Sequence, residues 1–183
     1  EKRGCICTRE FTTDLSLVRA CKKVLHEYGD IFCMFPEARY TPDGTLCILP
    51  PTIGKLAKKN NVPVVVLLNH GNYLNLPFWT NFKFRKTPIR VEMKQILTAE
   101  EVAEKSVDEI NEIIRKEMEY DEYKWQKDNN IRIKEKFRAE GLNKILYQCP
   151  NCKTEHKMIS KGIHLWCEEC GKKWEMTELG EMK

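Results

Sequence analysis

The sequence contains no apolar stretch long enough to cross a bilayer and no low-complexity tract. Its longest aliphatic run covers residues 62–68 and is interrupted by Pro63, whereas a membrane-spanning helix needs about 20 apolar residues. Hydrophobic residues make up 42% of the chain and charged residues 32%, which excludes a chain that is disordered throughout. No segment has the pattern of a signal peptide. With 183 residues, the chain is expected to fold as one domain plus a small module.

The cysteines lack the even count and the spacing of a secreted disulfide framework. There are nine of them, and four form two Cys-x-x-Cys pairs. The other five are scattered along the front of the chain: Cys5, Cys7, Cys21, Cys33 and Cys47. An odd count with two matched pairs is typical of a protein that sits in the reducing cytosol and holds one metal ion. We therefore expect a cytoplasmic protein.

The two pairs, Cys149/Cys152 and Cys167/Cys170, predict a closed four-thiolate metal site. Fourteen residues separate them, and a hairpin of that length can bring the two turns around one ion. The prediction is a zinc ribbon that holds a structural Zn²⁺, although the spacing suits a rubredoxin-like iron site as well. A redox dithiol is disfavoured, because it would not need two matched pairs.

The predicted ribbon, residues 145–183, has no excess of positive charge. It holds six Lys+Arg and six Asp+Glu, whereas binding to nucleic-acid phosphates requires a basic face. The sequence therefore disfavours nucleic acid as a partner and favours a structural role for the ribbon. His156 and His164 lie between the cysteine pairs and are expected to be exposed hairpin residues, because four thiolates already complete the site.

Positive charge is concentrated in the front of the chain. Residues 1–98 hold 15 Lys+Arg against 8 Asp+Glu, and residues 99–183 hold 16 against 19. A cationic half of this kind suits a phosphate, a nucleotide-like cofactor, nucleic acid or an acidic membrane surface. Taken alone, the charge is explained more simply by solubility.

Hydrophobic periodicity and turn signals predict an α/β fold. Helices are predicted at 14–29, 52–60, 106–127 and 130–140. Strands are predicted at 31–35, 63–68 and 88–95. Because the first two strands are wholly apolar and a helix separates them, they predict a βαβ unit within a mainly parallel sheet flanked by helices. The expected domains are an α/β domain at 1–98, a helical segment at 99–144 and a small zinc ribbon at 145–183.

The turn after the first predicted strand carries a candidate anion site. Residues 35–39 read Phe-Pro-Glu-Ala-Arg, so Glu37 and Arg39 would lie at the carboxyl end of a strand, where ligands bind in open parallel sheets. The guanidinium of Arg39 offers a planar fork that suits phosphate. An ion pair between these two side chains on the surface would account for the same residues.

Four short blocks follow one another between residues 4 and 70. They are Gly-x-x-x-x-Arg at 4–9, Phe-Pro-Glu at 35–37, Gly-Lys-Leu-Ala at 54–57 and Val-Pro-Val-Val-Val at 62–66. Their order and spacing resemble the lysophospholipid acyltransferases, of the 1-acyl-sn-glycerol-3-phosphate acyltransferase type. That family carries a Phe-Pro-Glu-Gly-x-Arg block. Here Ala38 replaces the glycine, the arginine lies one residue nearer the glutamate, and Val66 replaces the second proline of the downstream block.

The resemblance implies a glycerolphosphate acyltransferase-like α/β domain and an acyl-transfer reaction in phospholipid biosynthesis. The donor would be an acyl thioester, either acyl-CoA or acyl carrier protein. The acceptor would be the free hydroxyl of a lysophospholipid such as 1-acylglycerol-3-phosphate. Carried over by position, Arg9, Glu37 and Arg39 would line the acceptor pocket, and the two arginines would contact its phosphate.

The family's catalytic His-x-x-x-x-Asp block precedes the first of these blocks, so it is expected upstream of residue 1. In that block the histidine accepts the proton of the hydroxyl and the aspartate orients the histidine. We therefore expect the 183-residue chain alone to be inactive, with no catalytic residue within it. Residues 70–75 begin with His70 but end with Asn75, which cannot stabilise an imidazolium as a carboxylate can. His70 is interpreted as a loop residue.

Residues 76–86 combine four aromatic side chains with three cations. This mixture is typical of a membrane interface, and the implied substrate is a membrane lipid, so a peripheral contact with the inner face of the membrane is expected. The alternative is a strand that buries Phe82 and Phe84.

A second function fits the same sequence. The chain could be a non-catalytic, acyltransferase-like scaffold whose zinc ribbon mediates protein or RNA binding. An upstream His-x-x-x-x-Asp block would favour the enzyme, and its absence would favour the scaffold.

Overall fold

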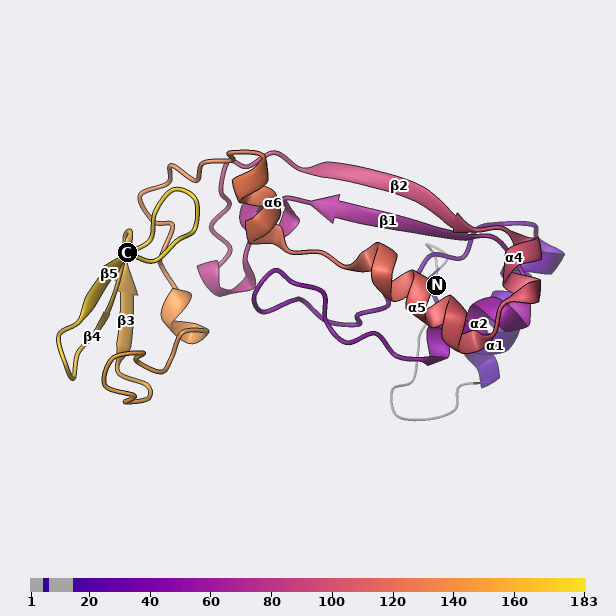
Figure 1. Ribbon diagram of the computed structural model, residues 1–183, viewed down its shortest axis with the longest axis horizontal. Helices are drawn as coiled ribbons and strands as arrows, with labels where there is room; N and C mark the ends of the chain where they lie inside the picture. The colour runs from indigo at the N-terminus through magenta and orange to yellow at the C-terminus, as the bar shows by residue number, and fades with distance from the viewer. Residues whose placement is uncertain (1–4, 7–14) are drawn as a thin grey trace. The chain divides into compact units, whose positions relative to one another are not determined.

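The computed structural model describes residues 5–6 and 15–183, which divide into two compact units with alternating segments (Figure 1). The first unit joins the described part of Glu1–Ala38 with Ile48–Val66 and Met93–Met118. The second unit joins Arg39–Cys47, Leu67–Glu92 and Glu119–Lys183. The expected ribbon at 145–183 is therefore one part of a larger unit that also takes segments from the front of the chain.

The first unit is mainly helical. Helix α1 (Leu15–Lys22) continues into the π-helical turn η1 (Lys23–Glu27), and Gly29 follows in the left-handed conformation with φ 64°. The other helices of this unit are α2 (Thr52–Asn60), α4 (Ala99–Glu104) and α5 (Val107–Met118). The predicted helices at 14–29 and 52–60 are confirmed.

Reciprocal capping boxes start α4 and α5. The Thr98 hydroxyl accepts from Glu101 N–H at 3.2 Å, and the Glu101 carboxylate accepts from Thr98 N–H at 2.8 Å. Ser106 and Glu109 repeat the arrangement at the start of α5, at 3.3 and 2.8 Å, as the sequence predicts. The single helix predicted at 106–127 is in fact two, because the Asp121 carboxylate caps a separate helix α6 (Glu122–Asp128).

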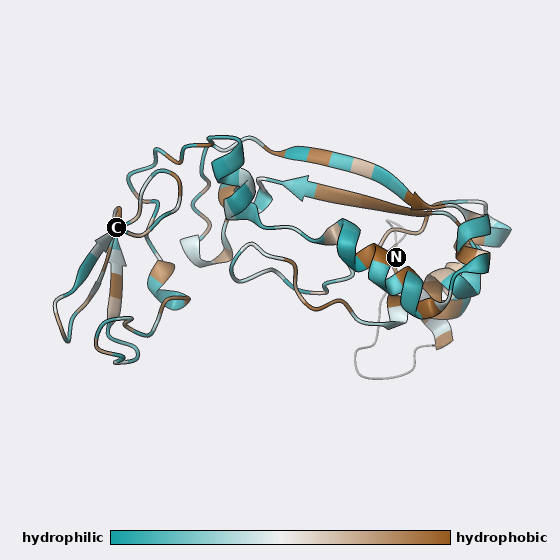
Figure 2. Cartoon of the chain, viewed as in Figure 1, coloured by the Kyte–Doolittle hydropathy of each residue, from teal (hydrophilic) through white to brown (hydrophobic). Residues whose placement is uncertain are grey.

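A glycine allows α2 and α5 to pack closely. Gly54 N–H donates to Asn111 Oδ1 at 2.8 Å, and a Cβ at Gly54 would lie 2.6 Å from that oxygen and 2.7 Å from Val107 O. Apolar side chains fill the space around this contact, and α5 alternates teal and brown in Figure 2 as an amphipathic helix does. The buried residues are Leu97, Val102, Ile110 and Ile114, with Ile53, Ala57 and Val64 packed against them.

The described strands form two sheets. Strand β1 (Val64–His70) pairs with β2 (Arg90–Leu97), and their arrows point in opposite directions in Figure 1. Strands β3 (Met158–Lys161), β4 (His164–Cys167) and β5 (Lys173–Glu175) form an antiparallel sheet in the order β3-β4-β5. Strands are confirmed at 63–68 and 88–95, but Val65 and Leu67 are 46% and 53% exposed, so the first is not buried on both faces as predicted. The mainly parallel sheet stays a prediction.

The apolar run at 31–35 is not a strand. Ile31 and Phe35 are each 86% exposed, and within the described chain no strand pairs with this segment. A continuous apolar run becomes a buried strand only where neighbouring elements cover both of its faces. The prediction of a buried strand here is therefore wrong, and the described partner of β1 is β2.

Residues 130–140 do not form the predicted helix, and two of their N–H groups bond instead to turns of the C-terminal region. Ile133 N–H donates to Glu178 O at 2.8 Å, and Ala139 N–H donates to Gly162 O at 3.0 Å. In a helix each would donate to the carbonyl four residues earlier. Both side chains are fully buried, so this segment serves as a packing partner for the C-terminal sheet.

The core of the second unit joins the C-terminal sheet to segments from elsewhere in the sequence. Trp79 is fully buried in it, and Gly141 approaches so closely that a Cβ there would lie 1.9 Å from Trp79 O. Its buried members are Trp79, Ala139, Leu142, Cys149, Met158, Leu165, Cys167 and Met176. Two of the predicted metal ligands are thus also core residues.

Candidate metal centre

The register of the strands and the turns beside them place the four cysteines close together. Met158 is paired with Cys167, and Leu165 is paired with Trp174, so these residues share the inner face of the antiparallel sheet. Cys167 ends β4, and Cys170 follows in the turn before β5. The first cysteine pair lies in the turn that precedes β3.

The two Cys-x-x-Cys turns have the same backbone hydrogen bonds. In each, the N–H of the first cysteine, Cys149 or Cys167, donates to the carbonyl five residues later at 2.9 Å. The carbonyl of the same cysteine accepts from the N–H four residues later, also at 2.9 Å. The residue at that fourth position is left-handed in both turns: Lys153 at φ 64° and Gly171 at φ 70°. The centre therefore consists of two structurally equivalent halves.

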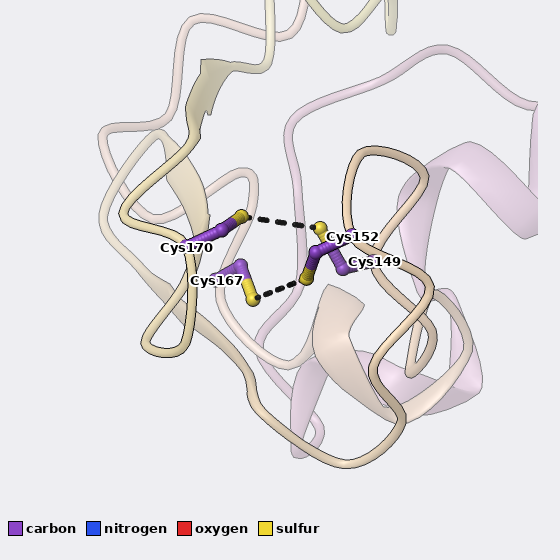
Figure 3. A group of neighbouring side chains, drawn as sticks. All are labelled: Cys149, Cys152, Cys167 and Cys170. Carbon is purple, nitrogen blue, oxygen red and sulfur yellow. Dashed lines mark hydrogen bonds between the residues drawn. The ribbon is translucent and has the colours of Figure 1, made fainter.

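The four sulfur atoms are spaced as metal ligands. Cys149 Sγ lies 3.7 Å from Cys170 Sγ, and Cys152 Sγ lies 3.7 Å from Cys167 Sγ (Figure 3). All four lie within 4.8 Å of one another. A tetrahedral ion with metal–sulfur bonds of about 2.3 Å requires sulfur–sulfur edges of about 3.8 Å, whereas a disulfide requires about 2.05 Å. The arrangement therefore fits one tetrahedral metal ion and does not fit a disulfide.

Neighbouring polar groups favour the thiolate form of one cysteine in each half, whereas burial and the adjacent Cys152 and Cys149 thiols raise the pKa of Cys167 to about 11. The Thr154 hydroxyl, 3.4 Å from Cys152 Sγ, and the Thr154 N–H lower the pKa of Cys152 to about 6. The N–H of Lys172 lowers the pKa of Cys170, and the Asn151 amide donates to its sulfur at 3.5 Å. Thiolates are the form that binds a metal. Sequence reasoning missed Thr154 and Asn151, although a polar residue within or next to a Cys-x-x-Cys turn would have indicated them.

The two histidines near the centre are not among its ligands. His156 is exposed, and its ring stacks on Tyr147 with centroids 5.3 Å apart. His164 lies on β4 opposite Glu175 and is partly buried, so the prediction that it is exposed holds only in part. Among the residues that the structure describes, the four cysteines are the one group of three or more Cys, His, Asp or Glu side chains placed to hold a metal ion.

The predicted acceptor-binding residues are placed only in part. Arg9 lies outside the described residues. Glu37 is half-buried within a turn that the Ala38 N–H closes onto Phe35 O at 3.1 Å, and it belongs to the first unit. Arg39 is exposed and belongs to the second unit. A common anion site for the three side chains stays a prediction.

His70 is not a loop residue, as the sequence suggested, but the last residue of β1. Its side chain is only 13% exposed, and Nε2 lies 3.3 Å from a carboxylate oxygen of Glu92. The ring stacks against Trp125 with centroids 5.4 Å apart and meets Tyr120 edge-on at 5.0 Å. Because packing encloses the imidazole on two sides, its position is that of a structural residue.

No family model, curated protein or solved structure matches the chain. The helices in the described part of the chain are each too short or too polar to span a bilayer.

Proposed function

We propose that the four cysteines hold one structural Zn²⁺ that stabilises the second unit. The sulfur–sulfur distances of 3.7 Å support this, because they lie close to the edge of a zinc–thiolate tetrahedron. A closed set of four protein ligands leaves no position for substrate or water, which is typical of a structural zinc. The ion would join the turn that precedes β3 to the turn between β4 and β5.

Metal analysis of the purified chain tests this proposal. We expect one zinc per chain, and Cys152→Ser should lose it, because one sulfur of the tetrahedron is removed. Cys33→Ser is the matched control, since Cys33 is exposed and lies in the first unit. Iron in place of zinc, or full zinc occupancy in Cys152→Ser, would contradict the proposal.

We further propose that the chain takes part in acyl transfer from an acyl thioester to a lysophospholipid. The acceptor oxygen would attack the thioester carbonyl, so that a C–O bond forms and the C–S bond breaks. The hydroxyl proton would pass to a base, and the thiol would leave with a proton. In this reaction Arg9 and Arg39 would hold the acceptor phosphate beside Glu37.

Backbone conformation at Ala38 supports this reading. The residue has φ 50°, in the left-handed region that glycine adopts most readily. It occupies the position where the resembled family block has glycine. A turn that requires a left-handed residue explains why a small residue follows the glutamate both in this chain and in the family block.

Binding of a short-chain lysophosphatidic acid, measured by calorimetry below its critical micelle concentration, tests the assignment. We expect Arg39→Gln to weaken binding about tenfold or more, because a charge-assisted contact to phosphate is lost. Arg19→Gln is the control, since Arg19 is an exposed cation of α1 outside the predicted site. Equal affinity in the parent and Arg39→Gln would favour the alternative of a non-catalytic scaffold.

A further inference from the structure

Residues 44–91 contain seven Lys+Arg and no Asp or Glu. The segment Leu67–Glu92 of the second unit includes residues 67–91 of this acid-free stretch. Several cations in it already have partners: Lys83 pairs with Glu140, and Arg85 is buried. Lys86 and Arg90 are exposed. Within this segment, Lys86 and Arg90 are therefore the cations that face solvent, and the Glu135 carboxylate accepts from the Lys86 N–H at 2.7 Å.

A loop in this stretch exposes three phenyl rings. The loop begins with the 3₁₀ turn η2 (Phe78–Thr80), and Phe78, Phe82 and Phe84 are 52%, 86% and 67% exposed. Trp79, by contrast, is fully buried. The alternative of a strand that buries Phe82 and Phe84 is therefore wrong, whereas the peripheral membrane contact stays a prediction.

The base of this aromatic loop, residues 78–84, is held firmly. Trp79 Nε1 donates to the Tyr73 hydroxyl at 3.0 Å, and the guanidinium of Arg85 lies 4.8 Å from the Trp79 ring. Arg85 also donates to Arg138 O at 2.6 Å, and its own N–H donates to Asn75 O at 2.8 Å. These contacts fix both ends of the loop, so its exposed rings are presented by a preformed structure.

The tip of the loop adopts a costly conformation. Asn81 and Phe82 are both left-handed, with φ 51° and 59°, and phenylalanine rarely adopts this conformation. The fold therefore holds a residue in a strained conformation while its apolar ring faces water. We infer that the aromatic loop inserts Phe82 and Phe84 into the interface of an anionic lipid bilayer, with Lys86 and Arg90 facing the lipid phosphates.

A bilayer fits these observations better than RNA does. RNA binding depends on many free cations, whereas here Lys83 is paired and Arg85 is buried. Apolar rings beside a few exposed cations on an acid-free segment are the chemistry of interfacial anchoring. The inference does not depend on acyl transfer, because it concerns a surface other than the acceptor-binding residues.

Sedimentation with vesicles of phosphatidylcholine containing about one-third phosphatidylglycerol tests the inference on the zinc-loaded chain. We expect the parent to bind these vesicles and to bind pure phosphatidylcholine at least about tenfold more weakly. Phe82→Asn should lower affinity about tenfold, and adding Phe84→Ser should reduce it further, since each removes an inserted ring. Asparagine is chosen because it tolerates the left-handed conformation. Phe82→Trp should retain binding.

Ile48→Ser is the matched control, since Ile48 is 87% exposed but lies in the first unit. It should bind vesicles as the parent does, and all variants should keep their zinc and their unfolding midpoints. Failure of the parent to bind, or equal binding by the double variant, would overturn the inference. Binding of poly-U RNA that is lost in the double variant, without vesicle binding, would assign the loop to RNA instead. Loss of lysophosphatidic acid binding in Arg39→Gln leaves these outcomes unaffected, so the two proposals can fail separately.

Discussion

Replacing Gly54 with alanine should destabilise the first unit by about 2 kcal/mol. The added Cβ would lie 2.6 Å from Asn111 Oδ1 and 2.7 Å from Val107 O, and the second of these is a backbone atom that cannot rotate away. Overpacking of this kind costs about 1–3 kcal/mol. Weakening of the bond from Gly54 N–H to Asn111 adds up to about 1 kcal/mol. The better helix propensity of alanine offsets about 1 kcal/mol of this loss in the free energy of unfolding.

Urea denaturation followed by two signals measures this effect. All four tryptophans lie in the second unit, so fluorescence reports that unit, whereas α1, α2, α4 and α5 of the first unit contribute much of the far-ultraviolet circular dichroism. We expect Gly54→Ala to lower the midpoint seen by dichroism and to leave the fluorescence midpoint in place. Lys55→Ala, on the exposed side of the same helix, should change stability by less than about 0.5 kcal/mol.

The Asn111→Ala background separates the two clashes. Removing the Asn111 side chain relieves only one of them, so Gly54→Ala should still cost about 1 kcal/mol there because Val107 O remains. A Gly54→Ala variant that is as stable as the parent, or more stable, would show that α2 and α5 do not approach as closely as the structure indicates.

Three further changes test other parts of the structure. Burial raises the pKa of the Glu122 carboxyl above its ordinary 4.5, so the folded chain binds that proton more tightly and its stability falls as pH rises above about 4.5. Urea midpoints measured across pH should therefore fall less steeply in Glu122→Gln than in the parent, and equal slopes would refute this reasoning. Gly171→Ala should destabilise the zinc-loaded chain by about 1 kcal/mol in thermal unfolding, because alanine is strained at a φ of 70°. No atom lies within 4 Å of the new Cβ, so the cost is conformational alone, and an unchanged transition would contradict it. Lys58 Nζ donates to three carbonyls near the end of α4, at 3.1, 2.7 and 2.6 Å. Lys58→Met should therefore lower the free energy of unfolding, followed by dichroism, by about 1–2 kcal/mol, while Lys59→Met should stay near the parent.

The four-cysteine cluster could be predicted from the sequence because each of its halves is local. Two residues between cysteines define a turn, and the same hydrogen bonds close the turn at Cys149 and at Cys167. The capping box at Ser106 is local in the same sense, since its partners are three residues apart. The break before α6 was missed, although Asp121 is an ordinary capping residue, because the apolar spacing continued across it.

Exposure of the aromatic loop could not be predicted from the sequence. Residues 78–84 mix aromatic and polar side chains in a way that suits either an interfacial loop or a strand that buries Phe82 and Phe84. Packing decided the outcome: Trp79 entered the core beside Gly141 and Leu142, and this left Phe82 and Phe84 outside it.

Local spacing in the sequence was thus sufficient for the cysteine turns, the helix caps and the strands β1 and β2. Tertiary structure alone decided that 31–35 is exposed and that 130–140 is not helical, since both depend on which distant segment supplies a partner. Ile133 and Ala139 have helix-compatible neighbours, but their N–H groups bond to carbonyls of the C-terminal hairpin. Hydrogen bonds and apolar contacts between residues far apart in the chain outweigh local preference, because burial contributes more free energy than propensity does.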